Sequence, residues 1–318
     1  MPSPTLLFTS LSAKKALYQE VLADARRFHP DARLLGTDCN PSCPAASAIE
    51  EFILMPPLSE MDATSFNSFC TEKGVTHVIP TRDGELNFLS QAREILAESG
   101  IEVFLAPAQA LAICLDKLLF SRRLSQLGIP VVSATTNLEE TQGERIVVKE
   151  RHGTGSAELG LDLNRETARD HAARLKDPIF QPYIRGREFS SEVWLDRNSS
   201  AKGVVLRWRE QVVAGESHRT VTFHNRDWED LVVRAAESLG LTGHVLGQVL
   251  VDKEGSPHFV EINPRLGGAT PLSIACGLHS IEWFLRETAG EDLSSLSMFR
   301  APAGKRLIRK DDAVRIEN

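Results

Sequence analysis

Two segments near the C-terminal end carry polar side chains at spacings that suit metal binding. They span residues 248–252 and 257–263, and the four residues between them, 253–256, are typical of a turn. We therefore predict a β-hairpin. In this hairpin we expect Asp252 to lie opposite Pro257, Leu250 opposite Phe259, and Gln248 opposite Glu261.

The alternation of side chains along the two strands sorts the polar residues from the apolar ones. Gln248, Glu261 and Asn263 share one face. We expect the other face to lie on the core, and it carries Val249, Val251, Val260 and Ile262. One carboxylate and two amide oxygens suit Mg²⁺, with Mn²⁺ as an alternative, whereas zinc would favour nitrogen or sulfur ligands. The alternative is an ordinary hairpin with a solvated polar face.

A lysine at the end of an apolar strand predicts an anion site. Lys149 follows the apolar run 146–148 and precedes a loop that contains Gly153, Gly155 and Ser156. Small residues let backbone N–H groups approach anionic oxygens, so this loop suits a phosphate. A plain hairpin turn is the alternative.

Two arginines are expected on one face of a second pair of strands. The segments 189–195 and 201–208 alternate as a hairpin, and Arg207 and Arg209 are two residues apart. Two forked guanidinium groups that project together suit a triphosphate or a carboxylate substrate. Solvated cations on an outer strand are the alternative.

The N-terminal third predicts a parallel sheet. Apolar strands at 5–8, 33–36, 76–80 and 102–105 alternate with helices at 14–28, 62–73 and 85–98, the second of them capped near Ser59. The stretch 6–13 lacks a Gly-x-Gly-x-x-Gly turn, which argues against a dinucleotide. Asp38 and the run 82–85 follow strands, where open sheets bind ligands, but they also suit loop charges and helix N-terminal acids.

From residue 107 the pattern changes, because apolar residues recur at helical spacing and predict one helix over 107–126.

The composition is that of a soluble enzyme. The chain has 318 residues, of which 42% are hydrophobic and 25% charged, and this length is enough for two or three domains. The net charge of −7 argues against nucleic acid, and no apolar run approaches membrane-spanning length. The five cysteines suggest reduced thiols, and we expect a cytoplasmic protein.

The run 261–265, Glu-Ile-Asn-Pro-Arg, resembles the metal-binding signature of the ATP-grasp superfamily. Further segments at 116–117, 127–130, 147–149, 181–184 and 188 follow in the order of that family. The chain looks most similar to single-grasp proteins that resemble half of a carbamoyl-phosphate synthase large subunit. The resemblance implies a Rossmann-like pre-ATP-grasp domain over 1–106, an α/β unit, and a two-lobed ATP-grasp domain of α+β type over 107–318, with lobes at about 107–184 and 185–318.

The resemblance also implies roles for individual residues. Phosphates of ATP would be bound by Lys117, Lys149, Gly153, Gly155 and Ser156, adenine by Gln181, Tyr183 and Ile184, and ribose by Glu188. Gln248, Glu261 and Asn263 would hold the metal, and Arg265 would be catalytic. The run 215–217, Gly-Glu-Ser, is similar to a Gly-Asp-Ser motif of the family, but the family's preceding histidine is replaced by Val212 or Val213. We assign its contact with the γ-phosphate to Arg207.

The function that follows is an ATP- and Mg²⁺-dependent ligase. It would phosphorylate a small carboxylate to an acyl phosphate and couple it to an amine or a thiol, which needs no Ser-His-Asp set. One alternative is a carbamoyl-phosphate-synthase-like enzyme that acts on bicarbonate or carbamate. Another is an ATP-binding sensor or subunit without turnover. A homodimer is an option for the assembly, and neither nucleic acid nor a membrane is an expected partner.

Overall fold

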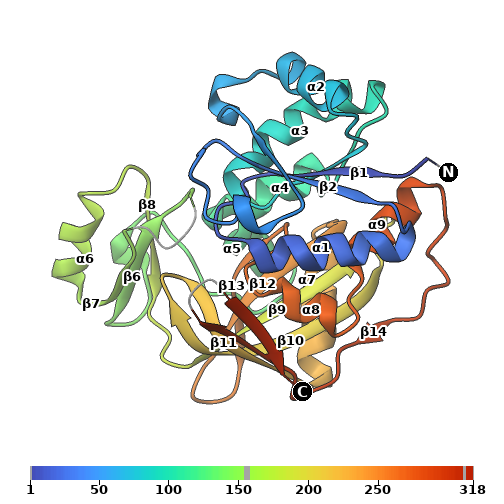
Figure 1. Ribbon diagram of the computed structural model, residues 1–318. Coiled ribbons are helices and arrows are strands. Elements are labelled where there is room, and N and C mark those ends of the chain that lie inside the picture. The colour runs from blue at the N-terminus through green and yellow to red at the C-terminus, as the bar shows by residue number, and fades with distance from the viewer. Residues whose placement is uncertain (1, 154–157, 311–312, 318) are drawn as a thin grey trace.

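The structure, a computed structural model, describes residues 2–153, 158–310 and 313–317. Its strands form three sheets that follow one another along the chain (Figure 1). The first has five strands, the second has three and the third has eight. This mixed architecture confirms the predicted fold class. The predicted domain boundaries at residues 106 and 184 stay a prediction.

The N-terminal sheet is parallel throughout, as predicted. Its order is β3-β2-β1-β4-β5, with the strands β1 (Thr5–Phe8), β2 (Arg33–Asp38), β3 (Glu51–Leu54), β4 (His77–Ile79) and β5 (Glu102–Val103). The helices that connect them include α1 (Lys15–Phe28), α2 (Ala63–Glu72) and α3 (Asp83–Glu98). Strand β3 was not expected. It lies at the edge of the sheet and has no buried residue, so it lacks the apolar alternation that marks a strand.

The cap of α2 differs from the prediction. Asp62, and not Ser59, precedes the helix, and its carboxylate accepts a hydrogen bond from the backbone N–H of Ser65 at 2.7 Å. The Ser65 hydroxyl lies 3.0 Å from the backbone nitrogen of Asp62, which closes a reciprocal capping box.

The helix predicted over 107–126 is two helices, α4 (Ala108–Leu115) and α5 (Lys117–Gln126). Asp116 separates them with an extended backbone, and its carboxylate accepts hydrogen bonds from the N–H groups of Leu118 and Leu119, each at 3.0 Å. Arg151 binds the same carboxylate at 2.8 and 2.6 Å. The apolar spacing predicted one helix because it continues across the break, whereas the cap at Asp116 begins a new helix at Lys117.

The middle sheet has the order β7-β6-β8, with β6 (Ile146–Glu150), β7 (Gly160–Leu163) and β8 (Pro178–Pro182). Helix α6 (Arg165–Ala172) covers it, and the two have a small apolar core of their own that includes Ile146, Val148 and Phe180. Figure 1 shows this unit at the left, apart from the other two sheets.

The third sheet has the order β13-β12-β9-β10-β11-β15-β16, and β14 pairs with β10. Its strands are β9 (Arg187–Leu195), β10 (Ala201–Val213), β11 (Glu216–Phe223), β12 (Gly243–Val251), β13 (Pro257–Asn263), β14 (Phe299–Arg300), β15 (Arg306–Lys310) and β16 (Ala313–Glu317). The helices beside it are α7 (Arg226–Ser238), α8 (Thr270–Ala275) and α9 (Ser280–Thr288). The hairpin predicted over 189–208 is confirmed by the antiparallel pairing of β9 with β10.

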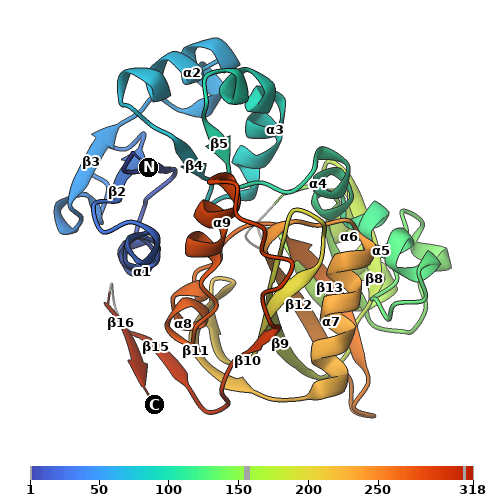
Figure 2. The same cartoon turned by 90° about the vertical axis from the view of Figure 1, so that its right-hand side faces the viewer.

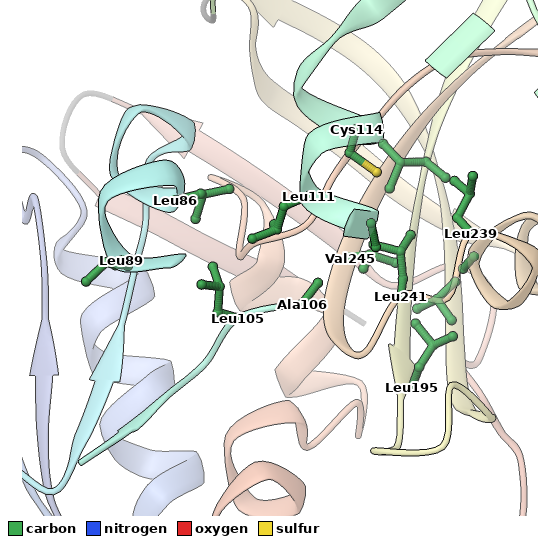
Figure 3. Close-up of a cluster of buried hydrophobic side chains, with 14 of the residues drawn as sticks. Leu86, Leu89, Leu105, Ala106, Leu111, Cys114, Leu195, Leu239, Leu241 and Val245 are labelled. Atoms are coloured by element: carbon green, nitrogen blue, oxygen red, sulfur yellow. The ribbon is translucent and has the colours of Figure 1, made fainter. Parts of the chain in front are cut away.

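One apolar core joins the N-terminal sheet to the third sheet. It includes Leu86 and Leu105 from the N-terminal unit, Leu111 from α4, and Leu195 and Val245 from the third sheet (Figure 3). A polar contact reinforces this packing where α1 lies beside α9 (Figure 2). There the buried carboxylate of Asp24 accepts from the backbone N–H of Ile281 at 2.8 Å and lies 2.8 Å from His279.

The described helices do not include one long and apolar enough to cross a membrane.

Candidate active site

The hairpin of β12 and β13 carries the predicted metal ligands, and its register contains a bulge. Gln248 pairs with Glu261, as predicted, but the next residue, Val249, already pairs with Phe259. Val260 is therefore the extra residue of a β-bulge. The predicted pairs Leu250–Phe259 and Asp252–Pro257 are wrong by one residue. Leu250 instead pairs with His258, and Val251 pairs with Pro257.

The turn and the bulge compensate for one another. Asp252 and Ser256 close the turn with a backbone hydrogen bond of 3.0 Å, so the loop contains three residues rather than four. Gly255 has a φ of 84°, a conformation that glycine adopts without strain. The shorter loop shifts the register by one residue, and the bulge shifts it back before Glu261.

The bulge also exchanges two side chains between the faces. Val249, Val251 and Ile262 are buried in the core, as predicted, but Val260 is not. Phe259 takes its place and is fully buried. Since a bulge is not visible in simple alternation, the face predicted for Val260 was wrong.

The three predicted metal ligands lie at one end of this hairpin. Gln248 is the cross-strand neighbour of Glu261, and the Asn263 amide donates to Glu261 Oε1 at 2.9 Å. The amide oxygen of Asn263 and the second carboxylate oxygen of Glu261 are thereby left for a cation. A carboxylate and two amides form an all-oxygen set that fits Mg²⁺.

Two lysines from other elements approach this end of the hairpin. Burial lowers the pKa of Lys149, on β6, to about 8, while Glu261 and Glu188 act to raise it and Lys117 lowers it further. Burial likewise lowers the pKa of Lys117, at the start of α5, and Glu261 and Asp83 oppose that shift. The carboxylate of Glu261 is therefore close enough to two half-buried lysines to raise their pKa values, and this grouping of charges suits a polyphosphate.

A pocket of about 150 Å³ opens beside these groups. Lys117, Glu261 and Asn263 line it together with residues from α3, from the end of α4 and from the loop after β6. Because α3 belongs to the N-terminal unit, the pocket lies where three parts of the chain meet.

The expected phosphate loop begins at the rim of this pocket. Gly153 lines the pocket and has a φ of 112°, which favours glycine, and its carbonyl oxygen accepts from Lys117 Nζ at 2.8 Å. Gly155 and Ser156 lie outside the described residues. Lys117 and the first residues of the loop after β6 thus lie together, and their assignment to phosphate, which the family resemblance implies, stays a prediction.

The segment predicted to hold adenine connects the middle sheet to the third sheet. Gln181, on β8, is buried and donates its amide to the carbonyl of Val132 at 3.3 Å. Tyr183 and Ile184 follow β8 and are partly buried. A Cβ at Gly186 would lie 1.9 Å from the carbonyl oxygen of Val251, so the backbone of this segment passes directly over β12.

Glu188, the residue expected at ribose, lies near the start of β9 and forms an ion pair with Arg209. Both residues line an open hollow of about 790 Å³, separate from the pocket at Lys117. Among the described residues Arg187, Arg219 and Arg306 also line this hollow.

Arg207 and Arg209 share a face, as predicted, since both approach the Ser217 hydroxyl, at 3.5 and 3.2 Å. Their environments differ. Arg207 is only 2% exposed and binds the fully buried carboxylate of Glu192 at 2.8 Å. It does not line the pocket at Lys117. The structure therefore does not bring Arg207 together with the other predicted phosphate ligands.

Arg265 reaches the N-terminal unit. Its Nε and Nη2 atoms donate to the two carboxylate oxygens of Asp83 at 2.7 and 2.5 Å, and its Nη1 donates to the Leu266 carbonyl at 3.0 Å. A guanidinium group has five N–H donors, so one donor on each terminal nitrogen is left for a substrate oxygen.

Two contributions to the site were missed by the sequence reasoning. Asp83 holds Arg265, and Asp116 begins α5 so that Lys117 meets the loop after β6. Asp83 was noted only as one acid in a charged run after a strand. The pairing could not be found from spacing, because 182 residues separate Asp83 from Arg265.

Comparisons with known families agree with this arrangement. Residues 114–269 match the model of the ATP-grasp domain, and residues 6–104 match the model of the PylC-like N-terminal domain. No curated protein matches the sequence.

Solved structures share the fold over nearly the whole chain. A biotin carboxylase from Campylobacter jejuni has a TM-score of 0.75 at 16% identity, covering 97% of this chain and 76% of that one. N5-carboxyaminoimidazole synthetase from Staphylococcus aureus has a TM-score of 0.71 at 16% identity, with coverages of 96% and 81%. An L-amino acid ligase from Bacillus licheniformis has a TM-score of 0.67 at 17% identity, with coverages of 96% and 79%. At these identities the likeness is one of fold.

Proposed function

We propose that this chain, which belongs to the ATP-grasp superfamily, is an ATP-dependent ligase that activates a small carboxylate and couples it to an amine or a thiol. The observation that carries the proposal is the meeting of Lys149 with Glu261. The first lies on the middle sheet and the second on the third sheet, and the Glu261 carboxylate is close enough to raise the pKa of Lys149. ATP bound between the two sheets would therefore have its phosphates between cations and a metal-binding carboxylate.

The proposed assignment of residues follows from these contacts. Lys117 and Lys149 are assigned to phosphate oxygens, and Gly153 lines the pocket together with Lys117. The segment with Gln181, Tyr183 and Ile184 is assigned to adenine and Glu188 to ribose. The loop residues Gly155 and Ser156 keep their assignment to phosphate.

Gln248, Glu261 and Asn263 would hold Mg²⁺, which would offset the charge of the phosphates when bound. The chain's own residues do the rest. The substrate carboxylate attacks the γ-phosphorus of ATP, so a P–O bond forms as the bond to ADP breaks, and an acyl phosphate results. The two free N–H donors of Arg265 stabilise the oxyanion that forms when the amine or thiol attacks the acyl carbon and phosphate leaves.

The proposed role of Arg207 at the γ-phosphate has weaker support. Its guanidinium is buried against Glu192, and a contact with ATP would require it to exchange that partner. Arg265 is therefore the first candidate for the catalytic cation.

A solved structure of the same fold, the biotin carboxylase domain of a 2-oxoglutarate carboxylase from Hydrogenobacter thermophilus, is a complex with bicarbonate, which keeps bicarbonate as a second candidate for the acid. The experiment is to incubate the protein with ATP, Mg²⁺ and single carboxylates, bicarbonate among them, and to measure ADP. Hydroxylamine is added in parallel, because it converts an acyl phosphate to a stable hydroxamate.

Acid-dependent ADP release with hydroxamate formation is the expected result. Turnover with bicarbonate alone would assign the second candidate. ATP binding without ADP release under any acid would contradict the ligase and support a binding subunit. Glu261→Gln serves as the inactive control.

A further inference from the structure

Two neighbouring strand ends of the N-terminal sheet take no part in the reaction described above. From β1 the chain continues outward to β2 and β3, and it returns to place β4 and β5 on the other side of β1. The carboxyl ends of β1 and β4 are thus the switch point of the sheet, where open α/β sheets bind their ligands. Residues 9–14 and 80–82 follow these strands, and we call them the switch-point loops.

A single buried carboxylate fixes both loops. Glu85, near the start of α3, accepts hydrogen bonds from the Thr9 hydroxyl at 2.8 Å and from the backbone N–H groups of Thr81 and Arg82 at 3.1 Å each. The Ser10 hydroxyl donates to its other oxygen. Since the carboxylate is buried and accepts four hydrogen bonds, it holds the loops in one arrangement.

The first loop presents an ammonium group. Lys14 Nζ donates to the carbonyl oxygen of Ser10 at 2.6 Å. Ser10 has a φ of 49°, in the left-handed region that residues with a side chain rarely occupy. Backbone strain of this kind persists only where the surroundings enforce it, and it is concentrated at functional sites.

The second loop presents a guanidinium group. Arg82 is exposed and forms no ion pair with any described residue. Its backbone is nevertheless fixed by Glu85, to which the first loop is also bonded. Lys14 and Arg82 therefore stand on two loops that share one anchor.

The electrostatic surroundings favour an anion between these two cations. Burial lowers the pKa of Lys14, Glu85 opposes the shift, and Arg82 and Arg265 lower the pKa further. Glu216 also opposes it, but its carboxylate lies 4.0 Å from Arg309. Cations that repel one another are stabilised when an anion binds among them.

The switch-point loops are connected to the reaction centre by adjacent residues. Asp83 directly follows Arg82 and binds Arg265 at two points. A substrate whose reacting carboxylate lies at Arg265 can therefore extend toward Lys14 and Arg82.

We propose that Lys14 and Arg82 bind a second anionic group of a substrate, a carboxylate remote from the reacting group. The inference rests on the proposed ligase function, because it extends the substrate site from Arg265. The group could belong to the acid or to the amine, and the chemistry of recognition is the same.

The test measures binding to the full chain by calorimetry in the presence of ADP and Mg²⁺. The probes are pairs that differ by one carboxylate: succinate with butyrate and glutarate with valerate for the acid, glycine with methylamine and β-alanine with ethylamine for the amine. The variants are Lys14→Met, Arg82→Ala and Arg82→Lys. Arg122→Ala is the control, since Arg122 is exposed on α5 and has no ion pair among the described residues.

We expect one set of probes to bind more tightly when it carries the additional carboxylate, and that set identifies the substrate that bears the group. Lys14→Met and Arg82→Ala should weaken its binding about 10- to 100-fold, as expected for loss of a charged hydrogen-bond donor. Arg82→Lys should restore part of the affinity. Arg122→Ala should change nothing, and the affinity for ATP should stay the same in every variant.

Equal binding of the paired probes by the wild-type protein would overturn the inference, and so would variants that weaken ATP instead of the probe. Failure of the ligase proposal is recognised separately. It would appear as an absence of acid-dependent ADP release, whereas the site at Lys14 and Arg82 is judged by probe binding alone.

Discussion

Arg265 and Asp83 form a two-point ion pair that joins the loop after β13 to the first residue of α3. The pair lies between the N-terminal sheet and the sheet that carries the hairpin with the proposed metal ligands. Asp83 is buried, and one edge of the Arg265 guanidinium is occupied by it. The ion pair therefore fixes the direction in which the remaining donors of Arg265 point.

The first prediction is that Arg265 affects chemistry more than nucleotide affinity. Arg265→Ala removes a charged donor aimed at a developing oxyanion, a change that typically lowers kcat by ~10²–10³-fold. The Kd for ATP should change little. Steady-state ADP release and calorimetric ATP binding on the same variant give both values. A normal kcat with a lower melting temperature would mean that the ion pair with Asp83 is only structural.

Asp83 supplies the control for this prediction. Asp83→Asn keeps Arg265 but weakens its anchor, so we expect a smaller loss of kcat than in Arg265→Ala. If Asp83 acts through Arg265, the double variant should be no slower than Arg265→Ala, because two residues that act as a unit are not additive. Additive losses would assign Asp83 a separate role.

The second prediction concerns the metal ligands. Glu261→Gln removes the only anionic member of the proposed set and should abolish Mg²⁺-dependent turnover without lowering the melting temperature. Asn263→Ala should be milder, because an amide contributes no net charge. Glu254→Gln is the matched control, as Glu254 is exposed in the turn of the same hairpin. Near-normal turnover by Glu261→Gln at saturating substrate would show that the hairpin does not hold the metal.

Much of this hairpin could be predicted from sequence, because alternation along a strand is a local property. Gln248, Glu261 and Asn263 were expected together, and they lie together. The bulge at Val260 could not be predicted, since the predicted and the observed pairing both place Glu261 opposite Gln248 and differ only closer to the turn. Only the packing of Phe259 into the core distinguishes them.

Contacts between distant parts of the chain were the second feature that could not be predicted from the sequence. The periodicity of α4 and α5 is continuous, so a cap at Asp116 that depends partly on Arg151 was not visible. The partner of Arg207 was missed for the same reason. Its spacing from Arg209 predicts a shared face, but it does not show that the guanidinium binds Glu192, which lies two residues along β9 from the residue opposite Arg207.

The third prediction uses the lowered pKa of Lys149. Its ammonium must be protonated to bind phosphate, so ATP affinity should fall as the pH rises through about 8. Lys149→Met should weaken ATP binding about 10- to 100-fold and remove this pH dependence. Calorimetric titrations with ATP on both sides of pH 8 give the measurement.

The same lysine should oppose the stability of the free protein. Its folded pKa, about 8, lies below its ordinary value of 10.5, so the unfolded chain binds more protons between these two values. Stability from this group therefore rises with pH across that window, and a charged Lys149 is unfavourable at neutral pH. Lys149→Met should raise the melting temperature, while Lys253→Met, in the exposed hairpin turn, should not. A lower melting temperature together with unchanged ATP affinity would contradict the assignment.

The last prediction decides between two roles for Arg207. If it is mainly the partner of Glu192, Arg207→Ala leaves the buried carboxylate without its guanidinium partner, and breaking a buried ion pair typically costs ~3–5 kcal/mol of unfolding free energy. Urea denaturation measures this loss. If Arg207 contacts the γ-phosphate, the unfolding free energy should be nearly preserved and kcat should fall by ~10²–10³-fold.

The pH dependence of the unfolding free energy tests independently whether Arg207 is the partner of Glu192. Although burial raises the pKa of Glu192, Arg207 and His244 lower it to about 2, below its ordinary value of 4.5. In the wild-type protein this group contributes stability above pH 4.5 that is lost as the pH falls toward 2. Without Arg207, burial is opposed by His244 alone, so the folded pKa of Glu192 rises and the group contributes less stability above pH 4.5. Denaturation of Arg207→Ala in buffers of increasing pH should therefore show a weaker rise of stability through the acidic range than the wild-type protein, and parallel slopes would mean that Arg207 does not hold the charge of Glu192.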